Sequence, residues 1–391
     1  MNLIGTMSIG IKAPIIKRGD NLINIVCDSV INACDHHNLE LEDRDIVAVT
    51  EAVVAKSQGN FATLDDVASD VKEKFGNETV GLIFPILSRN RFLLILKGIA
   101  RGVKKLVIQL SLPSDEVGNH LVSQEQLIES GINPYATLTE EEFYEKFGTP
   151  KHEFTGVNYV ELYKQHGGEN CEIIFSNNPC AILQYTKNVI NADIHTREMT
   201  KRTLVKAGAE KVYSLSDILN KSINGSGFNP EYGVLGSNVS TDETIKLFPK
   251  NTMEFAQDLQ DEFKKRTGKT IECMVYGDGA FKDPVGKIWE LADPVVSPGF
   301  TAGLLGLPNE IKFKYVADNE LGSLSEQEAQ EKIIAMIKEK SNNLKNQNLS
   351  LGTTPRRLTD LLGSLSDLTS GSGDKGTPFI LIKNYFKNYS D

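Results

Sequence analysis

The segment 271–279 reads Ile-Glu-Cys-Met-Val-Tyr-Gly-Asp-Gly, an apolar run that ends at two glycines around an aspartate. Its first six residues predict a strand, because apolar and β-branched residues fill a run of strand length that a glycine ends. A helix is expected just before it, over Thr252 to Thr267, ending at Gly268. The stretch therefore predicts a helix that leads into a strand, with a carboxylate directly after the strand.

Apolar runs alternate with Gly and Pro along the whole chain, and no period of about 20 to 50 residues repeats. This alternation indicates a mixed α and β fold, which we class as α+β. Further strands are expected at Asp45–Thr50, Thr79–Phe84, Lys105–Leu110 and Pro378–Lys383. Further helices are expected at Leu64–Phe75, Ser123–Ser130, Thr139–Phe147, Glu198–Ala207 and Ser325–Asn342.

The chain has 391 residues, more than one domain usually contains. Its middle region, residues 111–178, is more polar than its flanks and contains two expected helices. We therefore predict an inserted helical subdomain there. Residues 1–110 and 179–391 are expected to form the two parts of one core, and the second part is expected to contain the metal and nucleotide segments.

Composition argues against several classes of protein. No apolar run approaches the roughly 20 residues that span a bilayer, and the first residues lack the pattern of a secretory signal, so a cytoplasmic protein without a membrane span is expected. Five cysteines without a Cys-x-x-Cys pair indicate neither a disulfide framework nor a thiolate metal site. The formal charge of -10 argues against nucleic acid as a partner but leaves nucleotides possible.

Carboxylates cluster after the expected strand at 271–276. Asp278 stands between two glycines, where a ligand can approach the backbone, and Asp283, Glu290 and Asp293 follow around Trp289. Oxygen donors of this kind suit Mg²⁺ or Mn²⁺. The alternatives are a glycine turn in which Asp278 bonds to the local backbone, and solvated surface acids for the other three.

A second candidate segment is Thr369 to Pro378, just before the last expected strand. It contains three glycines, several hydroxyl groups and Lys375, the groups that a backbone site for phosphate needs. It is not a Walker motif, because no Gly-Lys-Ser/Thr ends it and a strand follows. A flexible linker is the alternative. Nearby cations are Arg356 and, after an earlier strand, Lys56.

Taken in order, these segments resemble the coenzyme F-420:L-glutamate ligases, which use GTP to attach glutamate through γ-amide bonds. Residues 233–239, Gly-Val-Leu-Gly-Ser-Asn-Val, are similar to a motif of that family. The resemblance covers most of the chain outside the middle region and implies an intertwined homodimer. It implies a metal ligand at Asp278 and nucleotide contacts at Ala13, Pro14, Ile15, Ile16, Lys56, Asn238, Ser370, Gly371, Gly373, Lys375 and Gly376.

The chain departs from the family at three implied metal ligands. Leu235 stands where the family has an aspartate, Gly279 where it has a threonine, and Ser372 where it has a glutamate. Either the metals have moved to other carboxylates or this branch no longer performs the reaction. We favour relocation, with Asp283, Glu290, Asp293, Asp242 and Asp374 as replacement ligands.

Amide formation explains this set of groups. A carboxylate reacts with an amine only after its oxygen becomes a good leaving group, and transfer of the γ-phosphoryl group of GTP gives such an acyl phosphate. That step needs cations to spread the phosphate charge rather than a protein nucleophile. We therefore expect GTP, L-glutamate and a carboxylate acceptor similar to a coenzyme F-420 precursor as substrates. The alternatives are a folate polyglutamate-type ligase and a nucleotide-binding sensor without catalysis.

Overall fold

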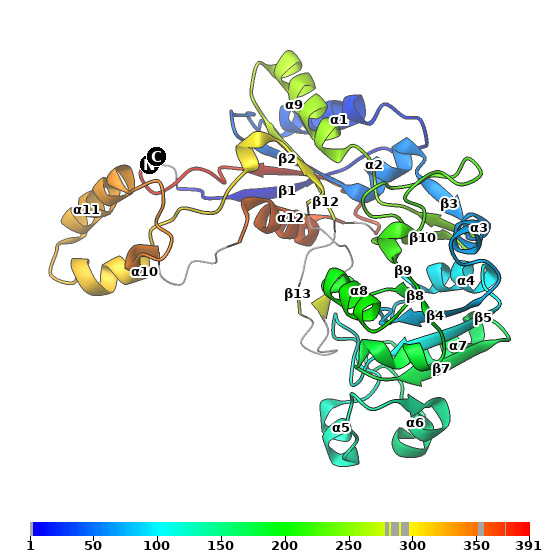
Figure 1. Ribbon diagram of the computed structural model, residues 1–391. Coiled ribbons are helices and arrows are strands. Elements are labelled where there is room, and N and C mark those ends of the chain that lie inside the picture. Colours follow the sequence, from blue (N-terminus) through cyan, green and yellow to red (C-terminus); the bar gives the residue numbers. More distant parts are fainter. Residues whose placement is uncertain (1–2, 278–280, 283–288, 291–296, 351–355, 372) are drawn as a thin grey trace.

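The computed structural model describes residues 3–277, 281–282, 289–290, 297–350, 356–371 and 373–391. A five-stranded sheet joins strands from both ends of the chain (Figure 1). Its order is β1 (Met7–Ile11), β16 (Phe379–Lys383), β2 (Ile46–Thr50), β12 (Glu272–Tyr276) and β15 (Gly299–Phe300). β2 and β12 are parallel, and the other neighbours are antiparallel. The predicted strands at 45–50, 271–276 and 378–383 are thus confirmed.

Helices cover both faces of this sheet, which explains why its strands are apolar without alternation. Val47 and Val275 pack with α1 (Leu22–His37) and α9 (Thr252–Thr267), whereas Ile46 and Met274 pack with α12 (Leu358–Thr369) on the other face. One ion pair is buried at the end of β16. Lys383 Nζ lies 2.6 Å from Asp45 Oδ2, with both side chains nearly inaccessible to water.

A second sheet has the order β6 (Leu138–Thr139), β7 (Cys171–Phe175), β5 (Lys105–Leu110), β4 (Thr79–Ile83), β8 (Asn188–Asn191) and β9 (Lys211–Ser214). All of its strands are parallel except β6. The chain moves outward from β4 through β5 to β7, and then returns to the other side of β4. In such sheets ligands bind beyond the carboxyl ends of the strands, where the order reverses, here between β4 and β8.

This second sheet crosses both expected domain boundaries, at residues 110 and 178. β7 belongs to the region 111–178, yet it pairs along its whole length with β5. The two helices expected in that region are present as α5 (Gln124–Ser130) and α6 (Glu140–Phe147), and both begin with capping boxes. A third helix, α7 (Tyr159–His166), was not expected. The layers are completed by α3 (Leu64–Phe75), α4 (Leu93–Arg101) and α8 (Arg197–Lys206).

A small third sheet links the two larger ones. It consists of β10 (Asn238–Thr241), β11 (Thr244–Lys246) and β3 (Phe61–Thr63), and β3 follows α2 (Glu51–Gln58). Two short strands, β13 (Phe281–Lys282) and β14 (Trp289–Glu290), pair with each other. Figure 1 shows α10 (Phe313–Val316) and α11 (Glu326–Glu339) projecting near the chain termini. Within the described residues, no helix has the length and apolar character needed to cross a membrane.

Candidate functional site

One edge of the five-stranded sheet gathers most of the segments that sequence analysis selected. Phe379, the first residue of β16, pairs with Ile11 at the end of β1 and with Val49, the last residue but one of β2. The last residue of β2, Thr50, pairs with Tyr276 at the end of β12. Consequently residues 12–20, α2, Gly277 and residues 370–378 all leave the sheet at this edge. We call it the nucleotide edge, after the nucleotide contacts predicted for these segments. Asp278, Asp283 and Asp293 lie outside the described residues, as does the side chain of Glu290.

Backbone hydrogen bonds hold these segments together at the nucleotide edge. Ala13 N–H donates to the Gly376 carbonyl over 3.1 Å, and Thr50 N–H donates to the Pro378 carbonyl over 3.1 Å. Gly371 and Thr377 form an isolated antiparallel bridge, so the loop between them is closed at its base. The sequence-predicted segments around Ala13, Lys56 and Gly376 therefore meet in space, although the role of each residue stays a prediction.

Side chains differ within the predicted nucleotide segments. Pro14 is exposed and Ile15 is 83% exposed, whereas Ile16 is only 4% exposed and packs into the core beneath α1. Asp374, Lys375, Gly373 and Gly376 are exposed, while Ser370 and Gly371 are half-buried. Ile15 can reach a ligand in solvent, and Ile16 can contribute only through its backbone.

The nucleotide edge is rich in cations although the chain carries a net charge of -10. Among the described residues, its exposed basic side chains are Lys12, Lys17, Arg18, Lys56 and Lys375. The nearby Asp20 carboxylate accepts a hydrogen bond from Lys17 N–H over 2.6 Å, within a turn. A concentration of positive charge on an acidic protein favours an anionic ligand such as a triphosphate.

The position of Leu235 does not fit a metal ion. Leu235 is 2% exposed and belongs to the large apolar core. It lines a cavity of about 20 Å³ together with Ile86, Phe92 and Ile194, among others. Across the described residues, no group of three or more His, Cys, Asp or Glu side chains could hold a metal. A metal bound as the family resemblance implies would therefore lack a ligand at this position.

Asn238 lies beside the loop that follows β4. It begins β10, where it pairs with Lys246, and its side-chain oxygen is 3.5 Å from Asn90 Nδ2. Val239 N–H donates to the Asn90 carbonyl over 3.0 Å. Asn90 belongs to the loop after β4, so Asn238 is located at the carboxyl edge of the second sheet.

The same carboxyl edge contains a pair of carboxyl groups that the sequence did not reveal. The Glu116 oxygens accept hydrogen bonds from Ile194 N–H over 2.5 Å and His195 N–H over 3.1 Å. Withdrawal of the carboxyl group from water and the adjacent Asp193 raise the pKa of Glu116 to about 8. Burial by itself would raise the pKa of Asp193. Hydrogen bonds from Glu116, Thr196 and Thr200 outweigh burial and hold this pKa below its ordinary value. The two side chains therefore share one proton at neutral pH.

Stability should depend on this proton. The folded-state pKa of Glu116, about 8, lies above its ordinary value of 4.5, so folded protein binds more protons between these values and loses stability as pH rises through them. Glu116→Gln keeps a donor toward Asp193 and cannot ionise. We expect the unfolding free energy of the variant, relative to wild type, to increase from pH 5 to 8 and then level off. Urea unfolding measured across this range tests it, and parallel curves for the two proteins would contradict it.

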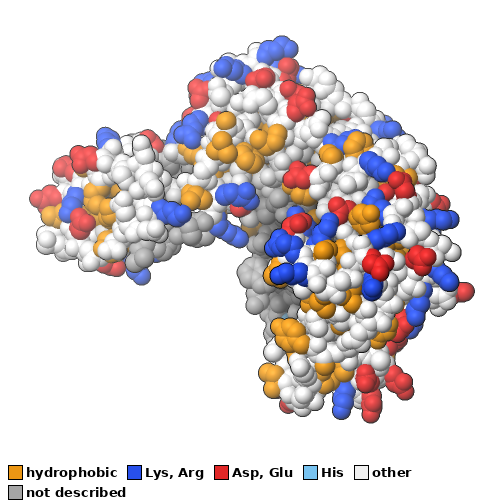
Figure 2. All heavy atoms as spheres, viewed as in Figure 1, with side chains coloured by type: hydrophobic (Ala, Val, Ile, Leu, Met, Phe, Trp, Pro, Cys, Tyr) orange, Lys and Arg blue, Asp and Glu red, His pale blue; other side chains and the backbone are white. Residues whose placement is uncertain are grey.

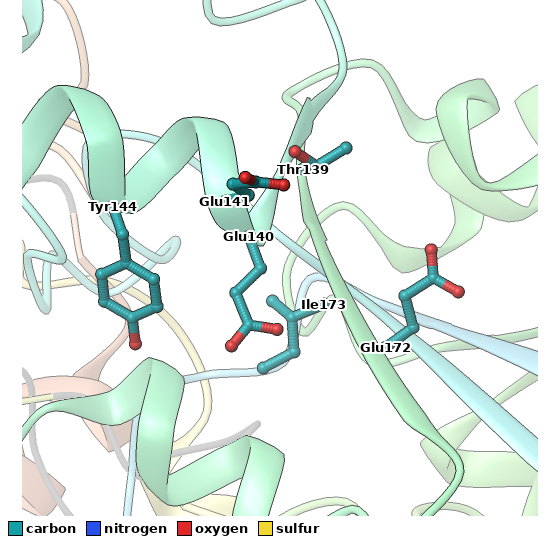
Figure 3. A pocket seen from close by; sticks show the side chains of 6 residues that line it. All are labelled: Thr139, Glu140, Glu141, Tyr144, Glu172 and Ile173. Carbon is teal, nitrogen blue, oxygen red and sulfur yellow. The ribbon is translucent and has the colours of Figure 1, made fainter.

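Two further surface features lie outside these segments. Thr139, Glu140, Glu141, Tyr144, Glu172 and Ile173 line a pocket of about 440 Å³. Figure 3 shows Ile173 between the side chains of Glu140 and Glu172. These two carboxylates are paired with Lys164 and Lys105, at 2.5 and 2.7 Å. Glu141, the third carboxylate in the lining, is outside these two pairs, and its negative charge disfavours a triphosphate.

The other feature is α8, over which Lys and Arg side chains gather in Figure 2. Arg202 and Lys206 are exposed there, and Lys201 is paired with Asp217 at 3.0 Å. α8 packs against the second sheet and is not among the segments that define the nucleotide edge. The cations on α8 provide useful controls for experiments on that edge.

Comparison with known proteins connects the nucleotide edge to a family. A family model described as F420-0:Gamma-glutamyl ligase matches residues 10–384. The chain belongs to this family. The match includes the second sheet, the five-stranded sheet except the first three residues of β1, and every segment of the nucleotide edge. The resemblance of the short motifs is thus confirmed at the level of the family.

Relatives within the F420-0:gamma-glutamyl ligase family match over shorter regions. The coenzyme F420:L-glutamate ligase of Methanosarcina acetivorans is 32% identical over 85 residues, which are 20% of this chain and 30% of that protein. The protein of the same name from Methanosarcina barkeri is 36% identical over 89 residues, or 22% of this chain and 31% of that protein. The chain thus spans less than a third of the length of these relatives.

Proposed function

We propose that the protein is a GTP-dependent ligase that joins L-glutamate to a carboxylate acceptor through an amide bond. The observation that carries this proposal is that the family match spans the nucleotide edge, where Ala13, α2 and the loop to Gly376 meet beside exposed cations. The acceptor is a compound similar to a coenzyme F-420 precursor, as the names of the relatives suggest.

In this proposal Lys56 and Lys375 contact the phosphates of GTP. Their charges stabilise the phosphoryl group as it leaves the nucleotide and reaches the acceptor carboxylate. The amine of glutamate then attacks the acyl carbon, which forms the amide bond and releases phosphate. Mg²⁺ or Mn²⁺ held by Asp278, with Asp283, Glu290 or Asp374, would screen the triphosphate. The proposal includes a homodimer, which light scattering can test against the 43.1 kDa of one chain.

Binding of GTP should stabilise the folded protein. A ligand that binds only the folded state raises the unfolding free energy by about 2.7 kcal/mol at 100 times its dissociation constant. We therefore expect GTP with Mg²⁺ or Mn²⁺ to raise the melting temperature by several degrees, and ATP to raise it less. Thermal unfolding followed by fluorescence measures this. An unchanged melting temperature in millimolar GTP would contradict the ligase proposal.

One observation supports a second candidate, a sensor that binds nucleotide without turnover. Leu235 in the apolar core removes one donor from the metal site that the resemblance implies. Release of phosphate from GTP in the presence of glutamate and acceptor separates the two candidates. A ligase turns over only when all three substrates are present, whereas a sensor shows the thermal shift and no phosphate release.

A further inference from the structure

A tight turn at residues 17–20 fixes the backbone of Arg18 against the end of α2. Lys17 N–H donates to Asp20 Oδ2 over 2.6 Å, and Gly19 N–H donates to the Ser57 carbonyl over 2.8 Å. The first bond closes the turn, and the second attaches it to the last turn of the helix that contains Lys56. Arg18 thus occupies a defined position at the nucleotide edge.

The Arg18 side chain lies in the space that a side chain at position 59 would fill. Gly59 ends α2 in the left-handed conformation, with φ of 65°. A Cβ atom at Gly59 would fall 2.5 Å from Arg18 Nε and 2.7 Å from its Cδ and Cγ. Such distances are too short for a Cβ contact, so a side chain at position 59 would force the arginine stem to move from this position. The stem is therefore packed against the helix end although the residue is exposed.

The Arg18 guanidinium has no hydrogen-bond or carboxylate partner within the part of the chain that the structure describes. Asp20, the nearest acid in sequence, uses a carboxylate oxygen in the turn. The neighbouring exposed side chains of Lys17 and Lys56 are also cations. Like charges placed close together repel each other, and a bound anion removes that repulsion.

We propose that Arg18 is an oxyanion-binding residue of the nucleotide edge, and that packing of its stem against Gly59 positions it for binding. Neither the family resemblance nor the proposed set of nucleotide contacts includes it. A guanidinium presents parallel N–H groups that match two oxygens of a phosphate or carboxylate, and a stem already packed loses less entropy on binding. The ligand is a phosphate of GTP or a carboxylate of glutamate, and this assignment of ligand rests on the proposed function.

Replacement of Arg18 tests the proposal. Hydrogen bonds to charged groups contribute about 1.5–3 kcal/mol. Arg18→Ala should therefore lower the affinity for the ligand that Arg18 contacts by roughly 10- to 100-fold. Titration calorimetry with GTP, GDP and GMP, together with the KM for glutamate, identifies the source of the oxyanion. Weaker binding of GTP and GDP but not GMP indicates the β-phosphate, and a raised KM for glutamate alone indicates a carboxylate. Arg18→Lys should recover only part of the affinity, because it keeps the charge and loses the paired donors. Arg202→Ala on α8 is the charge control.

Replacement of Gly59 separately tests whether its contact with Arg18 matters for binding. Gly59→Ala should displace Arg18 and lower the affinity for the same ligand. It should also destabilise the protein, because alanine is strained in the left-handed conformation. Gly131 ends α5 with φ of 66° and has no atom within 4 Å of a Cβ position. Gly131→Ala therefore imposes the same backbone strain without displacing an arginine, and it should leave ligand affinity unchanged.

Inorganic pyrophosphate separates failure of this inference from failure of the proposed function. If wild type binds neither GTP nor glutamate, the proposed function is wrong, but pyrophosphate should still raise its melting temperature more than that of Arg18→Ala. Equal responses of the two proteins to pyrophosphate, GTP and glutamate would overturn the role of Arg18.

Discussion

Leu235→Asp is expected to destabilise the protein by roughly 3–5 kcal/mol, the cost of a buried charge without a partner. Leu235 is 2% exposed and shares its cavity with Ile86, Phe92 and Ile194. The cavity, about 20 Å³, is too small for a metal ion with its water ligands. Restoring the aspartate that the family resemblance implies should therefore destabilise the protein rather than complete a metal site. Urea unfolding at pH 7 measures the loss.

Leu235→Ala is the control, because it removes the apolar side chain without adding charge. We expect Leu235→Asp to be clearly less stable than Leu235→Ala, with and without Mn²⁺. Equal stability of the two variants, or recovery of Leu235→Asp by Mn²⁺, would mean that the aspartate finds a partner. Arg91 lines the same cavity, so Leu235→Asp combined with Arg91→Ala would identify that partner.

Local sequence patterns were sufficient for most elements of the five-stranded sheet. Strands such as β2 and β12 are buried on both faces, so they appear as continuous apolar runs between polar or glycine boundaries. α9 ends at Gly268 in the left-handed conformation, as the glycine predicted. The capping boxes at Ser123 and Thr139 are formed as expected. In each case the signal lies within a few residues of the element.

Elements with weaker local signals escaped prediction. β1 is an edge strand with Gly10 inside it, and α4 is so apolar that its run fits a strand as well as a helix. α1 did contain a signal that could have been used. Asn21 caps its first turn, and Val26 and Val30 lie on one buried face.

Local sequence patterns did not predict the extent of the second sheet. β7 lies within a polar region that suggested an insertion, yet its own residues are apolar and pair with β5 more than 60 positions earlier. Parallel pairing joins strands that are distant in sequence, so composition averaged over the region 111–178 concealed the strand. For the same reason the sequence could not show that Asn238 contacts Asn90.

The candidate site was predictable where it follows the ends of strands, and not where it depends on tertiary contact. Segments after β1 and β2, and before β16, were selected from glycines, hydroxyl groups and a lysine, and they do meet. The Glu116 and Asp193 pair joins loops 77 positions apart. The contact of Arg18 with Gly59 depends on the packing of a turn against a helix end. No pattern along the sequence marks either one.

Asp278→Asn is expected to lower glutamate ligation by roughly two to three orders of magnitude while the protein stays folded. Asp278 lies one residue beyond Gly277, after a buried strand that ends at the nucleotide edge. Asparagine keeps the size of the side chain and removes the charge that a metal ion requires. Charge stabilisation by such an ion is worth several kcal/mol in the transition state, and each 1.36 kcal/mol corresponds to about tenfold in rate.

The experiment combines a metal titration with substitutions of the neighbouring acids. GTP turnover and glutamate incorporation should be measured over a range of Mn²⁺, and Mn²⁺ binding should be followed separately by electron paramagnetic resonance. A lost ligand first appears as weaker Mn²⁺ binding and a raised metal requirement. Asp283→Asn and Glu290→Gln should behave as Asp278→Asn does if these residues replace the missing ligands, and as wild type if they are surface acids. Should Asp278→Asn bind Mn²⁺ and turn over GTP as wild type does at low Mn²⁺, the metal is held elsewhere and the proposed site is wrong.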